Sequence, residues 1–369
     1  MKIILFSIGY LILNLFILHT TAYAQDWEQV GKLDGSPISI TFADDNVGWV
    51  ADEEGKIWKT INGGKNWDIV LDKKKIGFHN TWTMIKFIDT AQGIFFGFDE
   101  ADSLYLARIY TSKDGGKNWS EALKDTMKNF EIPKSIIVVN NSIIGLFSKS
   151  LYKTDNWGKS WKRFTLPNGN WYSITYTDSL NLWVAGELGS LQEIREYIIH
   201  STDGGLTWED KYDFYRTDYD KIQRVNNTIF AISPVGMIYT KNNGKNWRLF
   251  EDNLNAKNFP NFNDLIMLNE DVGYIAGFHS IVKVSVSQEK FSSTEITPYL
   301  GWINYIISSP SKRFIWAFTY NGYVYKHEEK IVSLREVQNQ KASIVYHEQI
   351  IKISLPGKNI NGLIKIYVK

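Results

Sequence analysis

The chain has 369 residues, with 41 basic and 40 acidic residues, a formal net charge of +1 and no cysteine. The balanced charge argues against the basic surface that nucleic-acid binding requires. The absence of cysteine excludes disulfides, thiol nucleophiles and thiolate metal sites. Stability must therefore come from the apolar core, and a domain of about 300 residues can bury a core of sufficient size.

The first 24 residues are typical of a secretory signal. One lysine precedes an apolar run from Ile3 to Leu18, and an A-x-A cleavage site ends at Ala24. The run is too short for a membrane anchor, and no stop-transfer pattern follows it. We therefore expect cleavage after Ala24, a secreted or periplasmic protein, and no membrane span in the mature chain.

An eight-residue segment then occurs five times, at Thr60–Trp67, Ser112–Trp119, Thr154–Trp161, Ser201–Trp208 and Thr240–Trp247. Each copy has a hydroxyl residue, Asp or Asn two positions later, a glycine and a closing tryptophan. Asp and Asn side chains bond nearby amides, and glycine accepts positive φ, so each copy predicts a hairpin turn under a packed indole. The predicted structural residues are Asn62, Asp114, Asn156, Asp203 and Asn242, with Trp67, Trp119, Trp161, Trp208 and Trp247.

These segments resemble the Asp-box, or bacterial neuraminidase repeat. That repeat is found in sialidase-like propellers, sortilin-type receptors, xyloglucanases and photosystem II assembly-factor propellers. The resemblance implies that each box forms the turn between the third and fourth strands of a blade, on the face away from the ligand. Box residues are then structural, and a role in Ca²⁺ or glycan binding is the alternative.

A larger unit surrounds each box and predicts seven four-stranded blades. Its second and third strands recur about 44 residues apart on average, a spacing typical of propeller blades. The N-terminal segment 26–30 copies the outer strand that follows each box, and the seventh unit lacks one. We expect this segment to close the last blade. The predicted strand pairs are 48–51 with 56–60, 93–98 with 106–111, 142–147 with 150–154, 182–185 with 197–201, 228–232 with 237–240, 273–277 with 281–284, and 313–318 with 323–326.

These patterns predict an all-β chain of three parts: a signal peptide over 1–24, a seven-bladed β-propeller over 25–329 and a β-rich tail over 330–369. The tail weakly resembles the start of a type IX secretion sorting domain. The Asn-Pro dipeptide common in such domains is missing, so the alternative is a β-rich segment that packs on or beside the propeller.

The face opposite the boxes is the expected recognition surface. Its loops are expected to carry the carboxylates Asp52, Asp99 and Glu187, the last followed by a loop insertion over 189–196. The blade-entry positions are expected to carry the rings of Trp82, Trp171, Tyr219, Phe262 and Trp302. Carboxylates and aromatic rings on one face suit a sugar or an extended peptide. The alternative is that the rings pack between blades.

Catalysis finds little support in the residues. Sialidases of similar fold need an arginine triad and usually show a Phe-Arg-Ile-Pro-like segment, whereas this chain has Glu131 in place of the arginine. Glycosidases need two carboxylates about 5 to 9.5 Å apart, for which Asp52, Asp99 and Glu187 are candidates. The histidines lack metal-binding spacings, and no P-loop or dinucleotide fingerprint occurs.

The sequence thus predicts a monomeric, exported, non-catalytic binding propeller without a cofactor or metal. The expected partner is a protein, peptide or glycan. The alternative is a glycoside hydrolase or a lectin-like propeller.

Overall fold

The computed structural model of the chain describes residues 27–76, 83–101, 104–190, 193–215, 221–233, 236–250, 262–277, 281–286, 302–329, 343–347 and 350–354. The chain divides into two compact units, residues 1–328 and 329–369. In the described part of the chain, no helix is long and apolar enough to cross a membrane.

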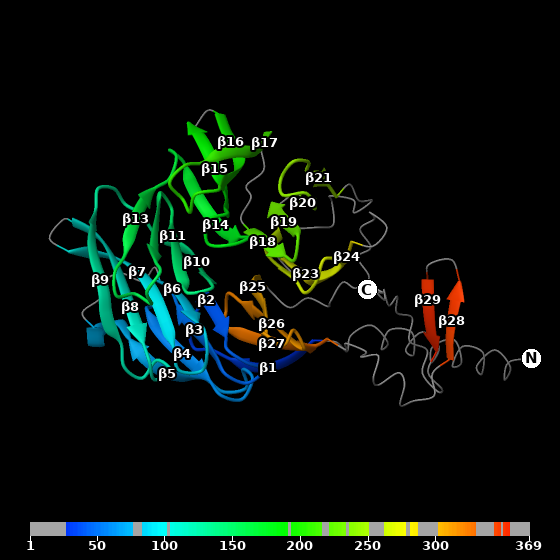
Figure 1. Cartoon of the computed structure of the whole chain (residues 1–369). Helices are drawn as coiled ribbons and strands as arrows, with labels where there is room; N and C mark the ends of the chain where they lie inside the picture. Colours follow the sequence, from blue (N-terminus) through cyan, green and yellow to red (C-terminus); the bar gives the residue numbers. More distant parts are fainter. Residues whose placement is uncertain are drawn as a thin grey trace, which may run out of the picture. The chain divides into compact units, whose positions relative to one another are not determined.

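The first unit is a seven-bladed β-propeller, as the sequence predicts (Figure 1). Blades 1 to 3 each contain four antiparallel strands in sequential order. The strands of blade 1 are β2 (Pro37–Phe42), β3 (Gly48–Asp52), β4 (Lys56–Thr60) and β5 (Asp68–Asp72), followed by the 3₁₀ turn η1 (Lys73–Ile76). The strands of blade 2 are β6 (Thr83–Phe87), β7 (Gly93–Ala101), β8 (Leu104–Ser112) and β9 (Ser120–Met127). The strands of blade 3 are β10 (Pro133–Val139), β11 (Ser142–Phe147), β12 (Ser150–Thr154) and β13 (Lys162–Thr165).

Blades 4 and 5 repeat this order, and blade 6 shows three strands within the described residues. The strands of blade 4 are β14 (Asn170–Tyr176), β15 (Leu182–Ser190), β16 (Glu193–Ser201) and β17 (Glu209–Tyr215). The strands of blade 5 are β18 (Lys221–Val225), β19 (Thr228–Ser233), β20 (Gly236–Thr240) and β21 (Arg248–Leu249). The strands of blade 6 are β22 (Phe262–Met267), β23 (Val272–Gly277) and β24 (Ile281–Ser285).

The N-terminal strand closes blade 7, which confirms the predicted closure. β1 (Glu28–Lys32) pairs antiparallel with β27 (Tyr323–Glu328), next to β26 (Phe314–Thr319) and β25 (Ile303–Ser308). Figure 1 shows β1 beside β27, although the two are about 300 residues apart in the chain. Trp27 fixes this junction because its ring stacks on His327 with centroids 5.3 Å apart. The first and last strands thus share one sheet and leave no open edge there.

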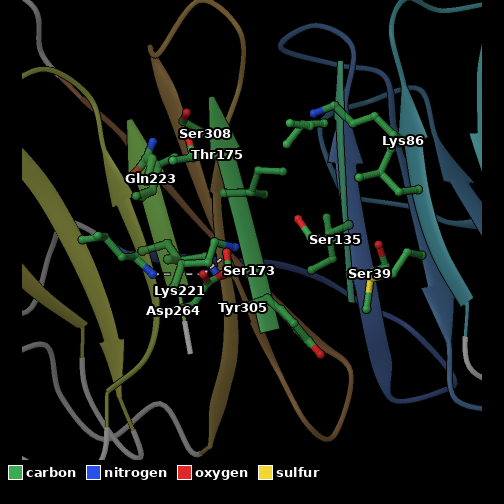
Figure 2. Close-up of a pocket in the computed structure, with 18 of the residues that line it drawn as sticks. Ser39, Lys86, Ser135, Ser173, Thr175, Lys221, Gln223, Asp264, Tyr305 and Ser308 are labelled. Carbon is green, nitrogen blue, oxygen red and sulfur yellow. Dashed lines mark hydrogen bonds and ion pairs between the residues drawn. The ribbon is translucent and has the colours of Figure 1, made fainter. Parts of the chain in front are cut away.

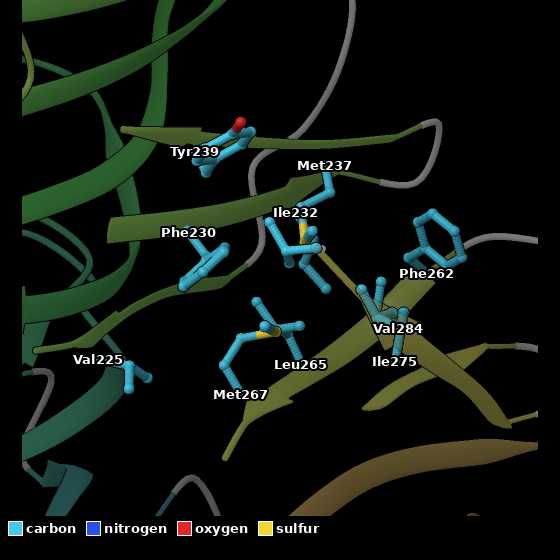
Figure 3. Close-up of a cluster of buried hydrophobic side chains, with 11 residues drawn as sticks. Val225, Phe230, Ile232, Met237, Tyr239, Phe262, Leu265, Met267, Ile275 and Val284 are labelled. Atoms are coloured by element: carbon cyan, nitrogen blue, oxygen red, sulfur yellow. The ribbon is translucent and has the colours of Figure 1, made fainter. Parts of the chain in front are cut away.

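The core is divided into clusters between neighbouring blades. The cluster between blades 5 and 6 is shown in Figure 3 and contains Phe230, Met237 and Leu265 among its buried residues. Corresponding clusters lie at the other six junctions. Apolar side chains of both faces of each blade are therefore buried, and the blades pack against one another around the ring.

Two predicted loops are strands instead. Asp99 lies inside β7, where it pairs with Leu106 of β8. The expected insertion over 189–196 continues the β15–β16 hairpin as far as the pair Ser190 and Glu193. Local alternation of residue types did not reveal these extensions, because both segments also contain the polar and charged residues that are typical of loops.

The second unit contains a described hairpin of β28 (Ser343–His347) and β29 (Ile350–Ser354).

Candidate functional site

A channel runs between the first strands of the seven blades. Residues of β2, β6, β10, β14, β18, β22 and β25, together with the segment that follows β25, line a cavity of about 490 Å³ (Figure 2). Each of these strands is the end strand of its sheet. Every second amide of an end strand points away from its sheet neighbour, so the channel is surrounded by amide donors that need acceptors from elsewhere.

Side chains of the preceding blade accept many of these amides. Each such bond joins neighbouring blades, and we call it a latch. The acceptor lies at one of two positions of an inner strand, those of Ser39 and Thr41 in β2. The latches are Ile85 N to Ser39 Oγ (3.0 Å), Phe87 N to Thr41 Oγ1 (3.4 Å), Ile222 N to Ser173 Oγ (3.1 Å), Arg224 N to Thr175 Oγ1 (3.1 Å), Met267 N to Gln223 Oε1 (2.7 Å) and Ile306 N to Asp264 Oδ2 (3.0 Å).

Four lysines and one aspartate line the channel, so it carries a positive charge. The Lys221 amine pairs with Asp264 at 2.9 Å, and Lys312 donates to the Leu268 carbonyl. The Lys134 amine lies over the Tyr172 ring, 5.1 Å from its centroid. Lys86 differs from these three, because its amine makes no hydrogen bond, ion pair or ring contact with another described residue. Burial lowers the pKa of Lys86, and the nearby charge of Lys221 lowers it further.

A second hollow lies on the loop face, between blades 7 and 1. It has a volume of about 430 Å³ and is lined by Lys32, Leu33, Asp34, Gly35, Ser36, Glu53, Tyr320, Asn321 and Tyr323. Next to it, Trp302 directly precedes the inner strand β25, and the Tyr320 amide donates to the Trp302 carbonyl at 2.9 Å. The two residues are 52% and 47% exposed. Tyr320 lines the hollow, and Trp302 lies directly before β25, a strand that lines the channel.

The structure corrects the predicted carboxylate surface. Asp52 is fully buried and accepts hydrogen bonds from Trp58 Nε1 at 2.7 Å and from the Lys56 amide at 2.8 Å. Burial raises its pKa, against the lowering effect of the Trp58 bond. Asp99 is also buried and accepts from Arg108 Nη1 at 3.1 Å. Glu187 accepts from Asn170 Nδ2 at 2.8 Å. Folding therefore uses Asp52 and Asp99 inside their blades and does not present them to solvent.

The predicted aromatic residues also divide into buried and exposed ones. Trp171 is fully buried between blades 3 and 4, and its Nε1 donates to the Pro167 carbonyl at 3.0 Å. Phe262 belongs to the buried cluster of Figure 3. Both rings thus pack between blades, which was the alternative, while Trp302 is exposed. Trp82 and Tyr219 lie outside the described residues.

The five repeated turns share one pattern of hydrogen bonds. In the first turn, Thr60 Oγ1 donates to Asn62 Oδ1 at 3.0 Å and accepts the Gly64 amide at 3.0 Å. Asn62 Oδ1 also accepts the Asn66 amide, and Trp67 Nε1 donates to the Gly64 carbonyl. Equivalent hydroxyl and Asx bonds form in the other four turns. These side chains bond within their own turns.

Sequence reasoning missed two features of the site. Indoles on second strands reach the turn of the next blade: Trp49 Nε1 donates to the Gly115 carbonyl at 3.1 Å, and Trp316 Nε1 donates to the Gly63 carbonyl at 2.9 Å. The channel residues Lys86 and Lys221 were also missed. Both occupy positions where other inner strands carry hydroxyl residues, so an alignment of the inner strands would have revealed them.

No family model matches the chain, and no curated protein matches it. Many solved structures resemble it, and two of them are described here. The first, described as YCF48 bound to D1 peptide, has a TM-score of 0.60 and 16% sequence identity, over 83% of this chain and 98% of that one. The second, YCF48 from Cyanidioschyzon merolae, has a TM-score of 0.63 and 16% identity, over 82% and 99%. At this identity the likeness shows the seven-bladed fold.

Proposed function

We propose that this protein is a non-catalytic binding propeller that recognises an extended segment of a protein or peptide at the loop-face end of its channel. The observation that carries this proposal is the exposure of two aromatic residues: Trp302, directly before the channel-lining strand β25, and Tyr320, whose amide donates to the Trp302 carbonyl. Exposed aromatic side chains with a polar end are enriched at binding surfaces, because they bury much apolar area with little loss of entropy. A protein of the same fold has been solved with a bound peptide, which supports this class of partner.

The state of the carboxylates favours binding over glycoside hydrolysis. A glycosidase needs two carboxyl groups that flank the bond to be cleaved, one of them able to donate a proton. Asp52 is fully buried under the Trp58 indole, and Asp99 is paired with Arg108. Neither can reach a sugar without breaking bonds that hold its own blade. Glu187 alone does not supply the pair.

Glycan binding without turnover is the second candidate, favoured by the hollow between blades 7 and 1. Tyr320 and Tyr323 lie there with Asp34 and Glu53. Sugar rings pack on aromatic faces, and their hydroxyl groups donate to carboxylates. The Ser36 hydroxyl already donates to Glu53 at 2.8 Å, which holds that carboxylate at the rim.

Peptide and glycan arrays separate these candidates, together with a panel of chromogenic glycosides. We expect the exported mature chain to retain peptides and to cleave no glycoside. Trp302→Ala should weaken peptide capture at least several-fold with little change in melting temperature. Trp157→Gly is the matched control, because Trp157 is 40% exposed on a repeated turn and the first, second and fourth turns have glycine at that position. Retention of glycans alone, or equal loss of peptide binding in both variants, would refute the proposed site.

A further inference from the structure

The junction between blades 1 and 2 defines two acceptor positions on an inner strand. Thr41 pairs with Trp49, whose neighbour Gly48 pairs with Thr60, the first residue of the repeated turn. Ser39 lies two residues before Thr41. Their hydroxyl groups accept the amides of Ile85 and Phe87 in the next blade. The junction between blades 4 and 5 repeats both bonds with Ser173 and Thr175.

The same register places Met84 and Lys86 at these two positions in blade 2. Lys86 pairs with Ile94, whose neighbour Gly93 pairs with Ser112, the first residue of the next repeated turn. Methionine is a weak acceptor, and an ammonium group is a donor only. Neither residue can therefore form the latch that the hydroxyl residues form in blade 1.

The amides that face this gap belong to β10 of blade 3. Val139 and Ser142 close the two-residue β10–β11 hairpin, as Val225 and Thr228 close the β18–β19 hairpin. In β18 the amides of Ile222 and Arg224 point away from the sheet, so the equivalent β10 amides are those of Ile136 and Val138. No described side chain bonds either amide.

The gap between β6 and β10 therefore brings together donors without an acceptor. The Lys86 ammonium, the two β10 amides and the Ser135 hydroxyl, which makes no bond to another described residue, all lie on strands that line the channel. Figure 2 shows Lys86 on one side of the pocket and the Lys221–Asp264 pair on the other. Asp264 is therefore paired with Lys221 and does not neutralise Lys86. Burial of unpaired donors is costly, and an anionic oxygen satisfies amides and an ammonium group at once.

We propose that the channel binds a carboxylate between β6 and β10, held by the Lys86 amine and by the amides of Ile136 and Val138. The cavity of about 490 Å³ admits the end of a chain or an acidic side chain, but no folded domain. If the proposed function holds, the carboxylate belongs to an acidic peptide. The oxyanion site itself does not depend on that function.

The first arm tests the site with sodium acetate alone. The full mature chain is labelled with [¹⁵N]valine, and the Val138 amide resonance is assigned by its loss in Val138→Ile. We expect a saturable downfield shift of this resonance with acetate, and the same shift in the control Lys117→Met, an exposed lysine of a repeated turn. In Lys86→Met the midpoint of the titration should rise roughly 10- to 100-fold, as expected for loss of one charge-assisted bond. Absence of a saturable shift in the wild-type protein would overturn the proposal.

The second arm tests the source of the carboxylate. Each peptide retained on the array is made in three forms. The first has a free C-terminal carboxylate, the second has a C-terminal amide, and in the third Asp and Glu are replaced by Asn and Gln. The dissociation constants of the three forms are then compared. If one of these replacements lowers the affinity of the wild-type protein roughly 10- to 100-fold but leaves the affinity of Lys86→Met unchanged, the bound group is that peptide carboxylate. If acetate binds but every peptide binds equally in both forms, the site takes a small free carboxylate, and the peptide source is refuted. If peptides bind and acetate does not, the proposed function stands without this site.

Discussion

Two neighbouring junctions of the ring are held in different ways. Between blades 1 and 2, polar bonds cross the junction beside the channel and at the repeated turn. Ser39 and Thr41 accept β6 amides, and Trp49 Nε1 donates to the Gly115 carbonyl. Between blades 2 and 3, the inner-strand bonds are missing in the described residues. There an apolar cluster that includes Phe96 and Phe147 fills the junction.

The second junction is also tied at its periphery. Arg163 of blade 3 donates to the Thr126 carbonyl and lies near Asp125 of blade 2, and the Tyr152 hydroxyl donates to Asp125 at 2.8 Å. Blades 2 and 3 are therefore joined by the apolar packing found at every junction and by these peripheral bonds, without latches among the described residues beside the channel. The inner strands of blades 2 and 3 can therefore lie side by side without latches, because the rest of the junction holds the two blades in place.

We call the junction between blades 1 and 2, which has latches, the closed junction, and the junction between blades 2 and 3 the open junction. The largest effect should come from the packing at the open junction. Phe147→Ala removes a fully buried ring between blades 2 and 3 and should lower the free energy of unfolding by about 3–5 kcal/mol. Phe130→Ala is the control, because Phe130 packs on Phe98 nearby but is 50% exposed, and it should cost less than ~1 kcal/mol. Urea unfolding of both variants measures the difference. Similar losses would mean that packing does not hold this junction.

The polar contact at the closed junction should have a smaller effect. Trp49→Phe keeps most of the ring stacked on Phe87 but removes the donor to the Gly115 carbonyl. Lys59 Nζ still donates to that carbonyl at 3.2 Å, so we expect a loss of about 1–2 kcal/mol. Trp183→Phe is the matched control, because the Trp183 Nε1 bonds no other described residue. This variant should lose only buried apolar area. Equal losses in urea unfolding would show that the indole bond contributes nothing.

The sequence predicted the fold well because its signals are short-range. The hydroxyl, Asx, glycine and tryptophan of each turn lie within eight residues. The hydroxyl and Asx bonds form within every turn, and the indole bond forms in three of the five. The closure by β1 could be predicted because segment 26–30 copies an outer strand. The channel depends on contacts such as Ser39 with Ile85, 46 residues apart, and on hairpin register. Composition does not reveal either, and it cannot distinguish the buried Asp52 from an exposed loop carboxylate.

The latches themselves should contribute about one hydrogen bond each. Ser39→Ala leaves the buried Ile85 amide without its acceptor and should lower the free energy of unfolding by about 1 kcal/mol. Ser135→Ala changes the equivalent residue of blade 3, whose hydroxyl bonds no other described residue, and should change stability by less than ~0.5 kcal/mol. Urea unfolding of both variants at neutral pH measures this difference. Reversal of this order would contradict the division into closed and open junctions.

The smallest effect should be the response of the closed junction to acid, through Asp114. This residue lies in the turn that receives the Trp49 indole, and its carboxylate accepts the Asn118 amide at 2.9 Å. That bond, with the Asn118 side chain, lowers the pKa of Asp114 to about 2. Because the folded pKa lies below the unfolded value of about 3.9, the bond stabilises the fold fully above pH 4, and this contribution is lost as the pH falls through 2.

Asp114→Asn gives this turn the asparagine found in the turn of blade 1 and removes its titration. Urea midpoints measured from pH 5 to pH 2 should therefore fall less steeply in Asp114→Asn than in the wild-type protein. Asp203, whose pKa is also lowered by the Thr207 bonds, titrates in both proteins and cancels in the comparison. Parallel curves would mean that the charge of Asp114 does not support the turn. A flatter curve would assign part of the acid sensitivity of the closed junction to a single carboxylate.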